Sequence, residues 1–149
     1  MTTASEPAPG PVYLDASALA KLYLAEEGSR ELERRLLGRR DLLVSELAVT
    51  EIVSAVSRRF RQGEFPAAAA ARFYQRLLGD LDRGVFSRLS ISRETHRAAE
   101  RILLASQTGE TLRALDSLHL ALAIEAEARS LLTYDDRLAR AATQHGLAC

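Results

Sequence analysis

The strongest constraint on the fold is the order of apolar patterns along the chain. Short apolar runs typical of buried strands alternate with longer segments whose apolar residues recur at helical spacing. Strands separated by helices in this way form a parallel sheet with helices packed on both of its faces. The pattern therefore predicts an α/β protein, a three-layer α/β/α sandwich around a central parallel sheet of four to five strands.

The expected strands and helices follow each other in a fixed order. Strands are expected at residues 12–14, 42–44, 85–91 and 130–133, with a short last strand at 147–149. Turn residues and helix caps such as Ser45, Pro66 and Ser92 separate these strands from the helices. The helices are expected to run through 19–23, over 29–37, from Ser45 to Gly63, from Pro66 through Leu81, over 93–107, over 112–128, and after Asp135 to about His145.

The chain length predicts a single domain. The 149 residues suffice for one core but not for a second full domain, so we expect a flexible leader at 1–11 and one domain at 12–149. No run of about 18 apolar residues is present and the start does not resemble a signal peptide. The only cysteine, Cys149, excludes an internal disulfide and a thiolate zinc site. We therefore expect a cytoplasmic protein without a membrane partner.

The charge balance limits how this chain can meet a nucleic acid. Twenty basic and twenty acidic residues give a net charge of zero, so binding by bulk charge is excluded and any RNA contact is local. All basic residues except Lys21 are arginine, which suits phosphate binding, although codon usage in a GC-rich genome gives the same excess. The RNA-binding candidates are Arg58, Arg59 and Arg61, followed on the next helix by Arg72 and Arg76. A solvated helix face is the alternative interpretation.

Two carboxylates lie close behind predicted strands. Asp15 follows the first strand directly, and Asp135 follows the fourth after a short interval. The carboxyl ends of parallel strands face one crevice, so both side chains are expected there. Glu51 and Asp116 instead interrupt apolar helical segments, where an unpaired carboxylate is costly. For either residue alone, a local ion pair with an arginine is an equally good explanation.

Taken together, the four carboxylates predict a metal site. Two like charges ~4 Å apart repel by about 4 kcal/mol near a protein surface, so a cluster needs a counter-charge. Mg²⁺ and Mn²⁺ prefer such oxygen ligands, and the three histidines show no zinc-ligand spacing. A metal held in this way supports phosphodiester hydrolysis. The catalytic and metal-binding candidates are Asp15, Glu51, Asp116 and Asp135, with Ser17 either as a ligand for water or phosphate or as a local helix cap.

Four stretches of the chain resemble the PIN-domain family, and within it the VapC-like ribonuclease toxins of bacterial toxin–antitoxin pairs. They are YLDASALAKLY at 13–23, SELAVTEI at 45–52, LDSLHLALA at 115–123 and LTYDDRL at 132–138. Together they span nearly the whole chain in the family's order. The resemblance implies an α/β/α sandwich, an endoribonuclease that depends on Mg²⁺ or Mn²⁺ and hydrolyses RNA, and a cognate VapB-like antitoxin that blocks the site.

The resemblance also assigns site residues. It places the same four carboxylates on the family's acidic positions, and its threonine pattern selects Asp135, two residues after Thr133. Asp136 is an alternative for this position, so Thr133 and Asp136 are regarded as supporting residues. His119 matches a residue common in the motif and is expected to pack or to hydrogen-bond beside Asp116.

Aromatic residues on the two helices around Gly63 predict a partner surface. Phe60, Phe65, Phe73 and Tyr74 provide more apolar surface than a small domain needs to expose. In similar proteins this region contributes to dimer and antitoxin contacts. We therefore predict a homodimer and an apolar groove in which these side chains are exposed to solvent.

Other functions remain as alternatives. An aspartate after the first strand also suggests a phosphatase of the haloacid dehalogenase type or a receiver domain, but both need a lysine late in the chain. Here Lys21 lies in the first predicted helix, and Ser17 replaces the second aspartate of the phosphatases. A PIN nuclease of RNA processing or decay is a closer alternative. A PIN scaffold that binds RNA or protein without cleavage would need a lost acidic position, and none is evident.

Overall fold

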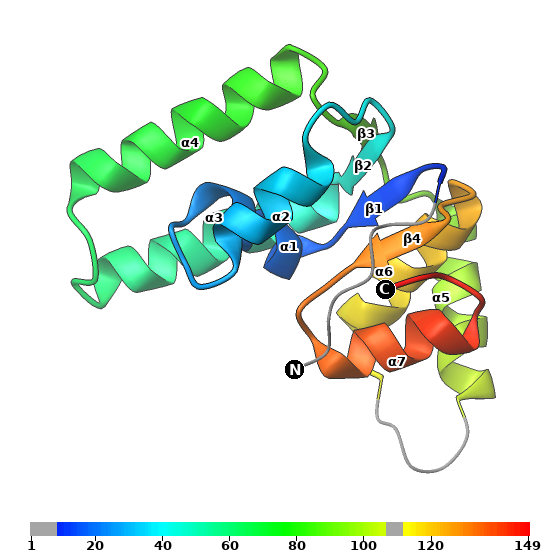
Figure 1. Ribbon diagram of the computed structural model, residues 1–149. Coiled ribbons are helices and arrows are strands. Elements are labelled where there is room, and N and C mark those ends of the chain that lie inside the picture. Colours follow the sequence, from blue (N-terminus) through cyan, green and yellow to red (C-terminus); the bar gives the residue numbers. More distant parts are fainter. Residues whose placement is uncertain (1–8, 107–111) are drawn as a thin grey trace.

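The computed structural model describes residues 9–106 and 112–149 and has a parallel sheet at its centre (Figure 1). The strands are β1 (Val12–Leu14), β2 (Leu42–Ser45), β3 (Ser87–Leu89) and β4 (Ser130–Leu132). They lie in the order β3-β2-β1-β4, and every neighbouring pair is parallel. In the register, Leu14 lies opposite Val44 on one side and Leu132 on the other.

Seven helices connect and cover the strands within the described residues. They are α1 (Ala16–Tyr23), α2 (Ser29–Leu36), α3 (Glu46–Arg61), α4 (Ala67–Asp82), α5 (Arg93–Ala105), α6 (Ala114–Glu125) and α7 (Asp136–Gln144). Helices α1 to α4 cover one face of the sheet and α5 to α7 the other, as Figure 1 shows. The predicted three-layer α/β/α sandwich is confirmed.

Alternation along β1 divides the interior into two apolar cores. Val12 and Leu14 point into the core shared with α1 to α4, whereas Tyr13 points into the core shared with α5 to α7. All three side chains are 0% exposed. Successive strand residues face opposite sides of a sheet, so a strand covered on both faces is apolar throughout. Tyr13 is therefore the one place where this central strand carries a polar atom into the interior.

Local caps set the starts of the helices where the sequence predicted them. The Ser45 side chain accepts a hydrogen bond from Ala48 N at 3.0 Å and begins α3. Ser92 begins α5 with a reciprocal capping box, and Pro66 precedes α4. Each side-chain cap satisfies a backbone N–H that has no partner inside its own helix. Gly63 lies between α3 and α4 with a φ of 76°, a conformation that favours glycine.

Three predicted boundaries were wrong. The strand at 85–91 is limited to β3, whose side chains are largely exposed because it is the edge strand. The helix at 112–128 begins at Ala114 and ends at Glu125, and Glu127 has a left-handed φ of 54°. The last strand at 147–149 is a single parallel bridge between Ser130 and Ala148. The predicted break at 108–110 lies outside the described residues.

The end of the predicted leader is attached to the domain. The Gly10 carbonyl accepts a hydrogen bond from Arg39 Nη2, and the Pro11 carbonyl accepts one from Arg129 N, both at 2.7 Å. Residues 1–8 lie outside the described part of the chain, so a flexible leader stays a prediction. Among the helices of the described residues, none is both long and apolar enough to cross a membrane.

Candidate active site

A cleft of about 770 Å³ opens beyond the carboxyl ends of β1 and β4. All four predicted carboxylates line it: Asp15, Glu51, Asp116 and Asp135. They come from the loops after β1 and β4 and from helices α3 and α6. The side chains that the sequence pattern predicted to share a crevice do share one.

Asp15 is the most buried of these carboxylates, with 5% of its surface exposed. Its Oδ1 accepts hydrogen bonds from Ser17 Oγ at 2.7 Å and Ala18 N at 2.9 Å, so Asp15 caps the start of α1. Its Oδ2 accepts one from Thr133 Oγ1 at 2.6 Å. Burial raises the pKa of Asp15, and these hydrogen bonds oppose the rise without cancelling it.

The hydroxyls of Ser17 and Thr133 join the loops that follow β1 and β4. Ser17 Oγ accepts a hydrogen bond from Tyr134 N at 2.7 Å, and Thr133 Oγ1 accepts one from Asp135 N at 3.0 Å. Because both hydroxyls donate to Asp15, they orient its carboxylate from two sides. The prediction that Ser17 caps its helix was wrong, since Asp15 is the cap. A ligand role for Ser17, which lines the cleft, stays a prediction.

Glu51 is held by a buried chain of side chains. Its Oε2 lies 2.5 Å from Nε2 of His119, whose Nδ1 lies 2.6 Å from the Tyr13 hydroxyl. That hydroxyl in turn lies 2.8 Å from Ser45 Oγ. Burial raises the pKa of Tyr13 above its ordinary value. His119, expected to lie beside Asp116, thus makes its hydrogen bonds to Glu51 and Tyr13.

Tyr13 and Ser45 were not recognised as site residues from the sequence. The available signal was the hydroxyl of Tyr13 between two buried apolar residues of β1, because such a group needs a partner inside the protein. The partner itself depends on how α6 packs against the sheet, which no local pattern contains.

Asp116 and Asp135 both lie at the start of a helix. Asp116 lies inside a helix, as predicted, where it is half-buried in the first turn of α6, and its Oδ2 accepts a hydrogen bond from Arg113 N at 3.0 Å. Asp135 Oδ1 caps α7 by accepting from the backbone N of Arg137 at 2.8 Å and of Leu138 at 3.3 Å. Asp136 is exposed and does not line the cleft. The geometry thus favours Asp135 over Asp136.

Arginine does not neutralise this cluster. None of the ion pairs between described residues joins an arginine to any of the four carboxylates, although Arg58 and Arg113 also line the cleft. The partners are hydroxyls, backbone N–H groups and His119. The local ion pairs considered for Glu51 and Asp116 are therefore not formed.

The donor set fits a hard divalent cation bound partly through water. Within the described residues, no three Asp, Glu, His or Cys side chains already form a metal-binding group. Mg²⁺ does not need such a cage, because it retains several waters and usually takes only one or two protein carboxylates. Asp15 supplies a buried carboxylate without a cationic partner among the ion pairs described, and three further carboxylates line the same cleft.

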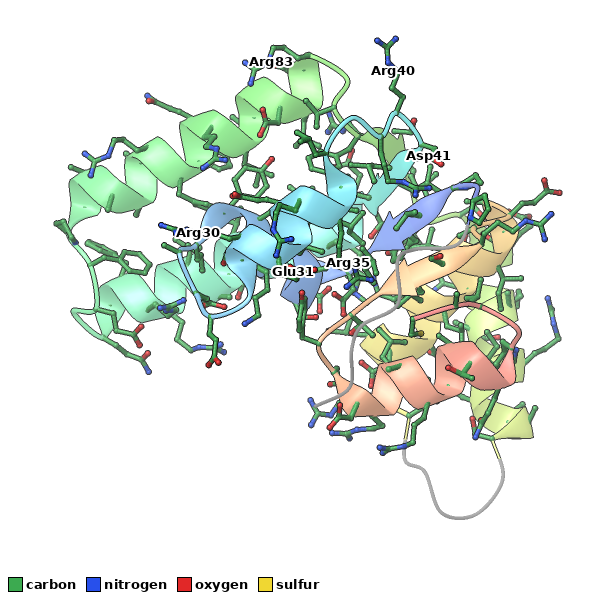
Figure 2. The ribbon with its side chains drawn as sticks, viewed as in Figure 1. Arg30, Glu31, Arg35, Arg40, Asp41 and Arg83 are labelled. Atoms are coloured by element: carbon green, nitrogen blue, oxygen red, sulfur yellow. The ribbon has the colours of Figure 1, made fainter. Side chains whose placement is uncertain are left out.

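The three arginines predicted to bind RNA have different surroundings. Arg58 lines the cleft, whereas Arg59 pairs with Glu26 at 2.8 Å and Glu64 at 2.6 Å. Arg61 Nη1 donates to Ser57 Oγ on the same helix at 2.8 Å. Other arginines are spread over the surface, and Figure 2 shows Arg40 and Arg83 at the outer edge of the molecule. Of the three candidates, Arg58 is the one beside the carboxylates, and RNA contact stays a prediction.

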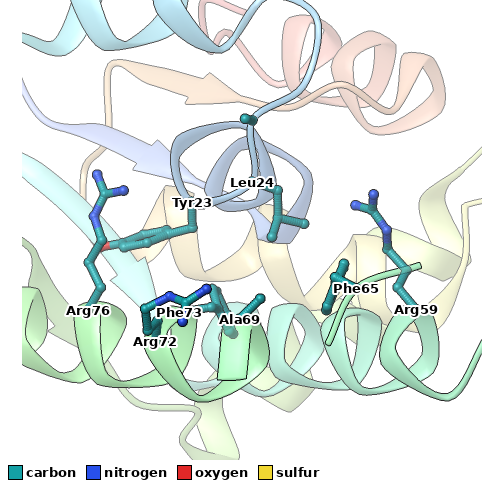
Figure 3. A pocket seen from close by; sticks show the side chains of 9 residues that line it. Tyr23, Leu24, Arg59, Phe65, Ala69, Arg72, Phe73 and Arg76 are labelled. Carbon is teal, nitrogen blue, oxygen red and sulfur yellow. The ribbon is translucent and has the colours of Figure 1, made fainter. Parts of the chain in front are cut away.

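A second pocket, of about 370 Å³, lies between the end of α1 and the α3–α4 hairpin (Figure 3). Aromatic side chains form its floor and arginines its rim: Tyr23, Phe65 and Phe73, then Arg59, Arg72 and Arg76. Two of the arginines lie over aromatic rings, with Arg76 5.3 Å from the Tyr23 centroid and Arg59 5.5 Å from that of Phe65. We call this hollow the arginine-rimmed pocket.

The predicted exposure of the aromatic residues was correct in part. Phe60 is 40% exposed and Tyr74 is 46% exposed, and Phe65 is half-buried. Phe73 is only 8% exposed because it packs into the core shared by α1 to α4. The four side chains do not form one groove: Phe60, Phe73 and Tyr74 line a hollow of about 170 Å³, and Phe65 lines the arginine-rimmed pocket.

Comparison with known proteins assigns the family. Residues 12–144 match the family model of the PIN domain. The chain belongs to the PIN-domain family. Two relatives from Mycobacterium tuberculosis span most of this PIN domain. Ribonuclease VapC46 is 33% identical and the match covers 92% of this chain and 94% of the relative. Ribonuclease VapC47 is 34% identical and the match covers 85% of this chain and 86% of the relative. The resemblance read from the four motifs is confirmed.

Solved structures share the fold of this PIN domain. The structure of Mycobacterium tuberculosis VapC20, described as a sarcin-ricin loop cleaving toxin, aligns with a TM-score of 0.68 at 15% identity, over 87% of this chain and 94% of that one. PAE2754 from Pyrobaculum aerophilum aligns with a TM-score of 0.63 at 22% identity, over 92% and 83%. At these identities the likeness supports the architecture of the PIN domain and not its substrate.

Proposed function

We propose that this PIN domain is a cytoplasmic endoribonuclease that depends on Mg²⁺ or Mn²⁺ and acts as the toxin of a toxin–antitoxin pair. The observation that carries the proposal is the cleft in which four carboxylates lie without an arginine ion pair among the described residues. RNA as the substrate is supported by two relatives that are named ribonucleases. The toxin role is supported by the description of VapC20.

The four carboxylates would hold the metal, and other residues of the cleft would orient a carboxylate or bind the phosphate of the RNA. When bound, the metal supplies a water of lowered pKa and stabilises charge on the phosphodiester. Ser17 and Thr133 keep the Asp15 carboxylate oriented by donating one hydrogen bond to each of its oxygens. Arg58 and Arg113 are placed to attract and orient the phosphate of the RNA, since guanidinium groups bind phosphate oxygens in pairs.

The test compares RNA cleavage by the wild-type protein and an Asp15→Asn variant, each with Mg²⁺, with Mn²⁺ and with a chelator. Cleavage should require the metal and fall at least about a hundredfold in the variant, because metal stabilisation is worth several kcal/mol and ~1.4 kcal/mol is tenfold in rate. Asp82→Asn, on the exposed end of α4, is the matched control and should cleave normally. Cleavage that persists in chelator or in the Asp15 variant would refute the mechanism.

The toxin role needs a separate measurement. Induced expression of the wild-type protein in a bacterial host should stop growth, and co-expression with a VapB-like protein from the same genome should restore it. Asp15→Asn should not stop growth. An RNA-cleaving protein whose expression leaves growth unchanged would point to a role in RNA processing or decay.

We further propose that the antitoxin binds at the arginine-rimmed pocket. The aromatic floor suits the apolar face of an amphipathic segment, and Arg72 and Arg76 on the rim suit acidic residues beside it. Arg72→Glu should weaken binding of the VapB-like protein at least about tenfold, because like charges across an interface cost several kcal/mol. Arg93→Glu on α5, on the other face of the sheet, is the control. Equal affinity of both variants, measured by calorimetry, would refute this site.

For the homodimer we propose the exposed aromatic surface of the α3–α4 hairpin. Phe60, Tyr74 and Leu78 expose apolar side chains there, and Leu78 is 38% exposed. Such a patch is more stable when covered by a second copy. Sedimentation of the wild-type protein should show a dimer, and Tyr74→Ser should shift it toward monomer. A wild-type monomer at high concentration would refute this.

A further inference from the structure

Three buried polar groups and the half-buried Glu51, from four different elements, form one continuous chain that reaches the wall of the cleft at His119 and Glu51. Ser45 ends β2, Tyr13 lies in the middle of β1, His119 lies in α6 and Glu51 lies in α3. The successive distances are 2.8 Å, 2.6 Å and 2.5 Å, from Ser45 Oγ to the Tyr13 hydroxyl, to His119 Nδ1, and from His119 Nε2 to Glu51 Oε2. Ser45 and Tyr13 are fully buried and His119 is 3% exposed. Water therefore has little access to this chain.

The direction of these hydrogen bonds follows from which atoms carry hydrogen. An ionised carboxylate only accepts, so His119 Nε2 must carry the proton that it shares with Glu51. Nδ1 then accepts, and the donor is the Tyr13 hydroxyl. The Tyr13 oxygen in turn accepts from Ser45 Oγ–H. Ser45 Oγ accepts from Ala48 N, so every polar atom of the chain has a partner of the correct kind.

The opposite direction leaves a hydrogen without an acceptor. If His119 Nδ1 carried a proton and donated to Tyr13, the Tyr13 hydroxyl would donate to Ser45 Oγ. Ser45 Oγ, which already accepts from Ala48 N, would then need a further acceptor for its own hydrogen. The hydrogen bonds between described residues provide none for this buried atom. An unsatisfied buried hydroxyl is unfavourable, so the direction toward Glu51 is preferred.

We propose that Ser45, Tyr13 and His119 are positioning residues that donate in sequence toward Glu51 and hold its carboxylate at the wall of the cleft. The chain directs the Nε2 hydrogen of His119 toward Glu51 and leaves Nδ1 to accept from Tyr13. It occupies Oε2 of Glu51 and leaves Oε1 for a ligand in the cleft. None of the three residues touches the substrate or the metal in this proposal, which rests on the proposed metal-dependent nuclease function.

The chain of hydrogen bonds connects helices that pack on opposite faces of the sheet. Glu51 lies on α3, on one side of the sheet, whereas His119 lies on α6, on the other. Tyr13 belongs to the strand between them, so the chain crosses the sheet and ties both helix layers to one carboxylate. Hydrogen-bonded partners of this kind orient a metal ligand, and removing one typically costs about 10-fold to 100-fold in metal affinity or activity.

The first test determines which ring nitrogen of His119 carries hydrogen in the metal-free protein. Nitrogen NMR of histidine-labelled protein distinguishes a ring nitrogen with hydrogen from one without, and His119→Gln identifies the signals among three histidines. We expect hydrogen on Nε2 and none on Nδ1 in the wild-type protein, and a changed Nδ1 signal in Tyr13→Phe. Hydrogen on Nδ1 in the wild-type protein would overturn the inference.

The second test measures Mn²⁺ affinity by calorimetry and RNA cleavage in Tyr13→Phe, which removes one hydroxyl from the chain. We expect Mn²⁺ affinity to fall about tenfold and KM for RNA to stay unchanged. Thr95→Val is the matched control, because it also removes a buried hydroxyl bond, from Thr95 to Glu125 at 2.8 Å, but does not line the cleft. Equal losses in both variants would show a purely structural role and overturn the inference.

A further pair of variants covers the case in which Tyr13→Phe does not fold. His119→Gln keeps a side-chain N–H that can donate to Glu51, whereas His119→Leu does not. Mn²⁺ affinity should be partly restored in the first and lost in the second. Equal Mn²⁺ affinity of the two variants would overturn this inference but not the proposed function. A wild-type protein that binds no Mn²⁺ would overturn the proposed function as well, so the two failures are distinguishable.

Discussion

The candidate active-site cleft and the arginine-rimmed pocket both contain charged side chains, carboxylates in the first and arginines in the second, and these charges are compensated differently. At the pocket, Arg59 pairs with Glu26 at 2.8 Å and with Glu64 at 2.6 Å, whereas Arg72 and Arg76 form none of the described ion pairs. In the cleft, hydroxyls, backbone N–H groups and a histidine hold the carboxylates, and no arginine pairs with them among the described ion pairs. The Arg59 ion pairs are satisfied within the chain, whereas the four cleft carboxylates have no arginine partner among the described ion pairs, and we propose a metal as their counter-charge.

This difference indicates that a cluster of charged side chains is suited to bind a ligand when its charges lack partners of opposite sign, whatever the number of charges. A solvent-exposed ion pair contributes at most about 1 kcal/mol, so its loss is tolerable. Carboxylates that share a cleft without cations repel each other, and that repulsion becomes binding energy when a metal arrives. Changes in metal, side chains and pH should therefore affect the cleft more than the pocket.

The largest effect is expected from added Mn²⁺. A ligand that binds only the folded state stabilises it by about 2.7 kcal/mol at 100 times its Kd. The free energy of unfolding of the wild-type protein, measured in urea, should rise by this amount, and that of Asp15→Asn should barely change. An equal rise in both proteins would show that the metal binds elsewhere.

The second largest effect is expected on RNA cleavage when the neighbouring residues Asp135 and Asp136 are replaced one at a time. Asp135→Asn should reduce RNA cleavage at least about tenfold, because Asp135 lines the cleft. Since asparagine also caps helices well, α7 should stay intact, which circular dichroism can check. Asp136→Asn should cleave like the wild-type protein, as Asp136 is exposed outside the cleft. The reverse order would assign the site to Asp136.

A smaller effect is expected from pH in the absence of metal. Burial raises the pKa of Asp15, so above its ordinary pKa the folded protein retains a proton that the unfolded chain has lost. The free energy of unfolding therefore decreases as pH rises from the ordinary to the raised pKa. Urea titrations in chelator from about pH 4 to pH 7 should show this decrease in the wild-type protein and a weaker one in Asp15→Asn. Parallel curves would contradict it.

The smallest effect is expected at the arginine-rimmed pocket. Glu26→Gln removes a partner of Arg59 but leaves Glu64 in place, so the free energy of unfolding should fall by less than about 1 kcal/mol. RNA cleavage should not change. A loss of cleavage comparable with that of Asp15→Asn would show that the two regions are coupled and that the comparison fails.

Much of the fold and part of the site could be predicted because they are local in sequence. Asp15 and Asp135 follow strands directly or nearly so, and a parallel sheet brings such positions to one edge. Glu51 was found as a carboxylate in an apolar helix. Asp116 was also predicted inside a helix, and because that helix begins at Ala114, Asp116 lies in its first turn, where backbone N–H groups need a hydrogen-bond acceptor.

The residues that support the site depend on contacts between distant segments. Tyr13 and His119 are separated by 106 residues, and Thr133 and Asp15 by 118. Arg58 and Arg59 point in different directions because neighbouring residues of a helix are about 100° apart around its axis, and the packing of α3 then decides that Arg58 lines the cleft and Arg59 the pocket. No periodicity or motif encodes such distances.

The amino-acid sequence alone specified the layered α/β architecture, the starts of α3, α4 and α5, and the edge of the sheet at which the carboxylates gather, since apolar periodicity and capping act within a few residues. The tertiary structure alone decided which groups hold each carboxylate, because a hydrogen bond requires two atoms within about 3 Å and only the packing of helices across the sheet brings them together. It also decided that Asp15 is buried without an arginine partner among the described ion pairs, and the proposed metal site rests on that arrangement.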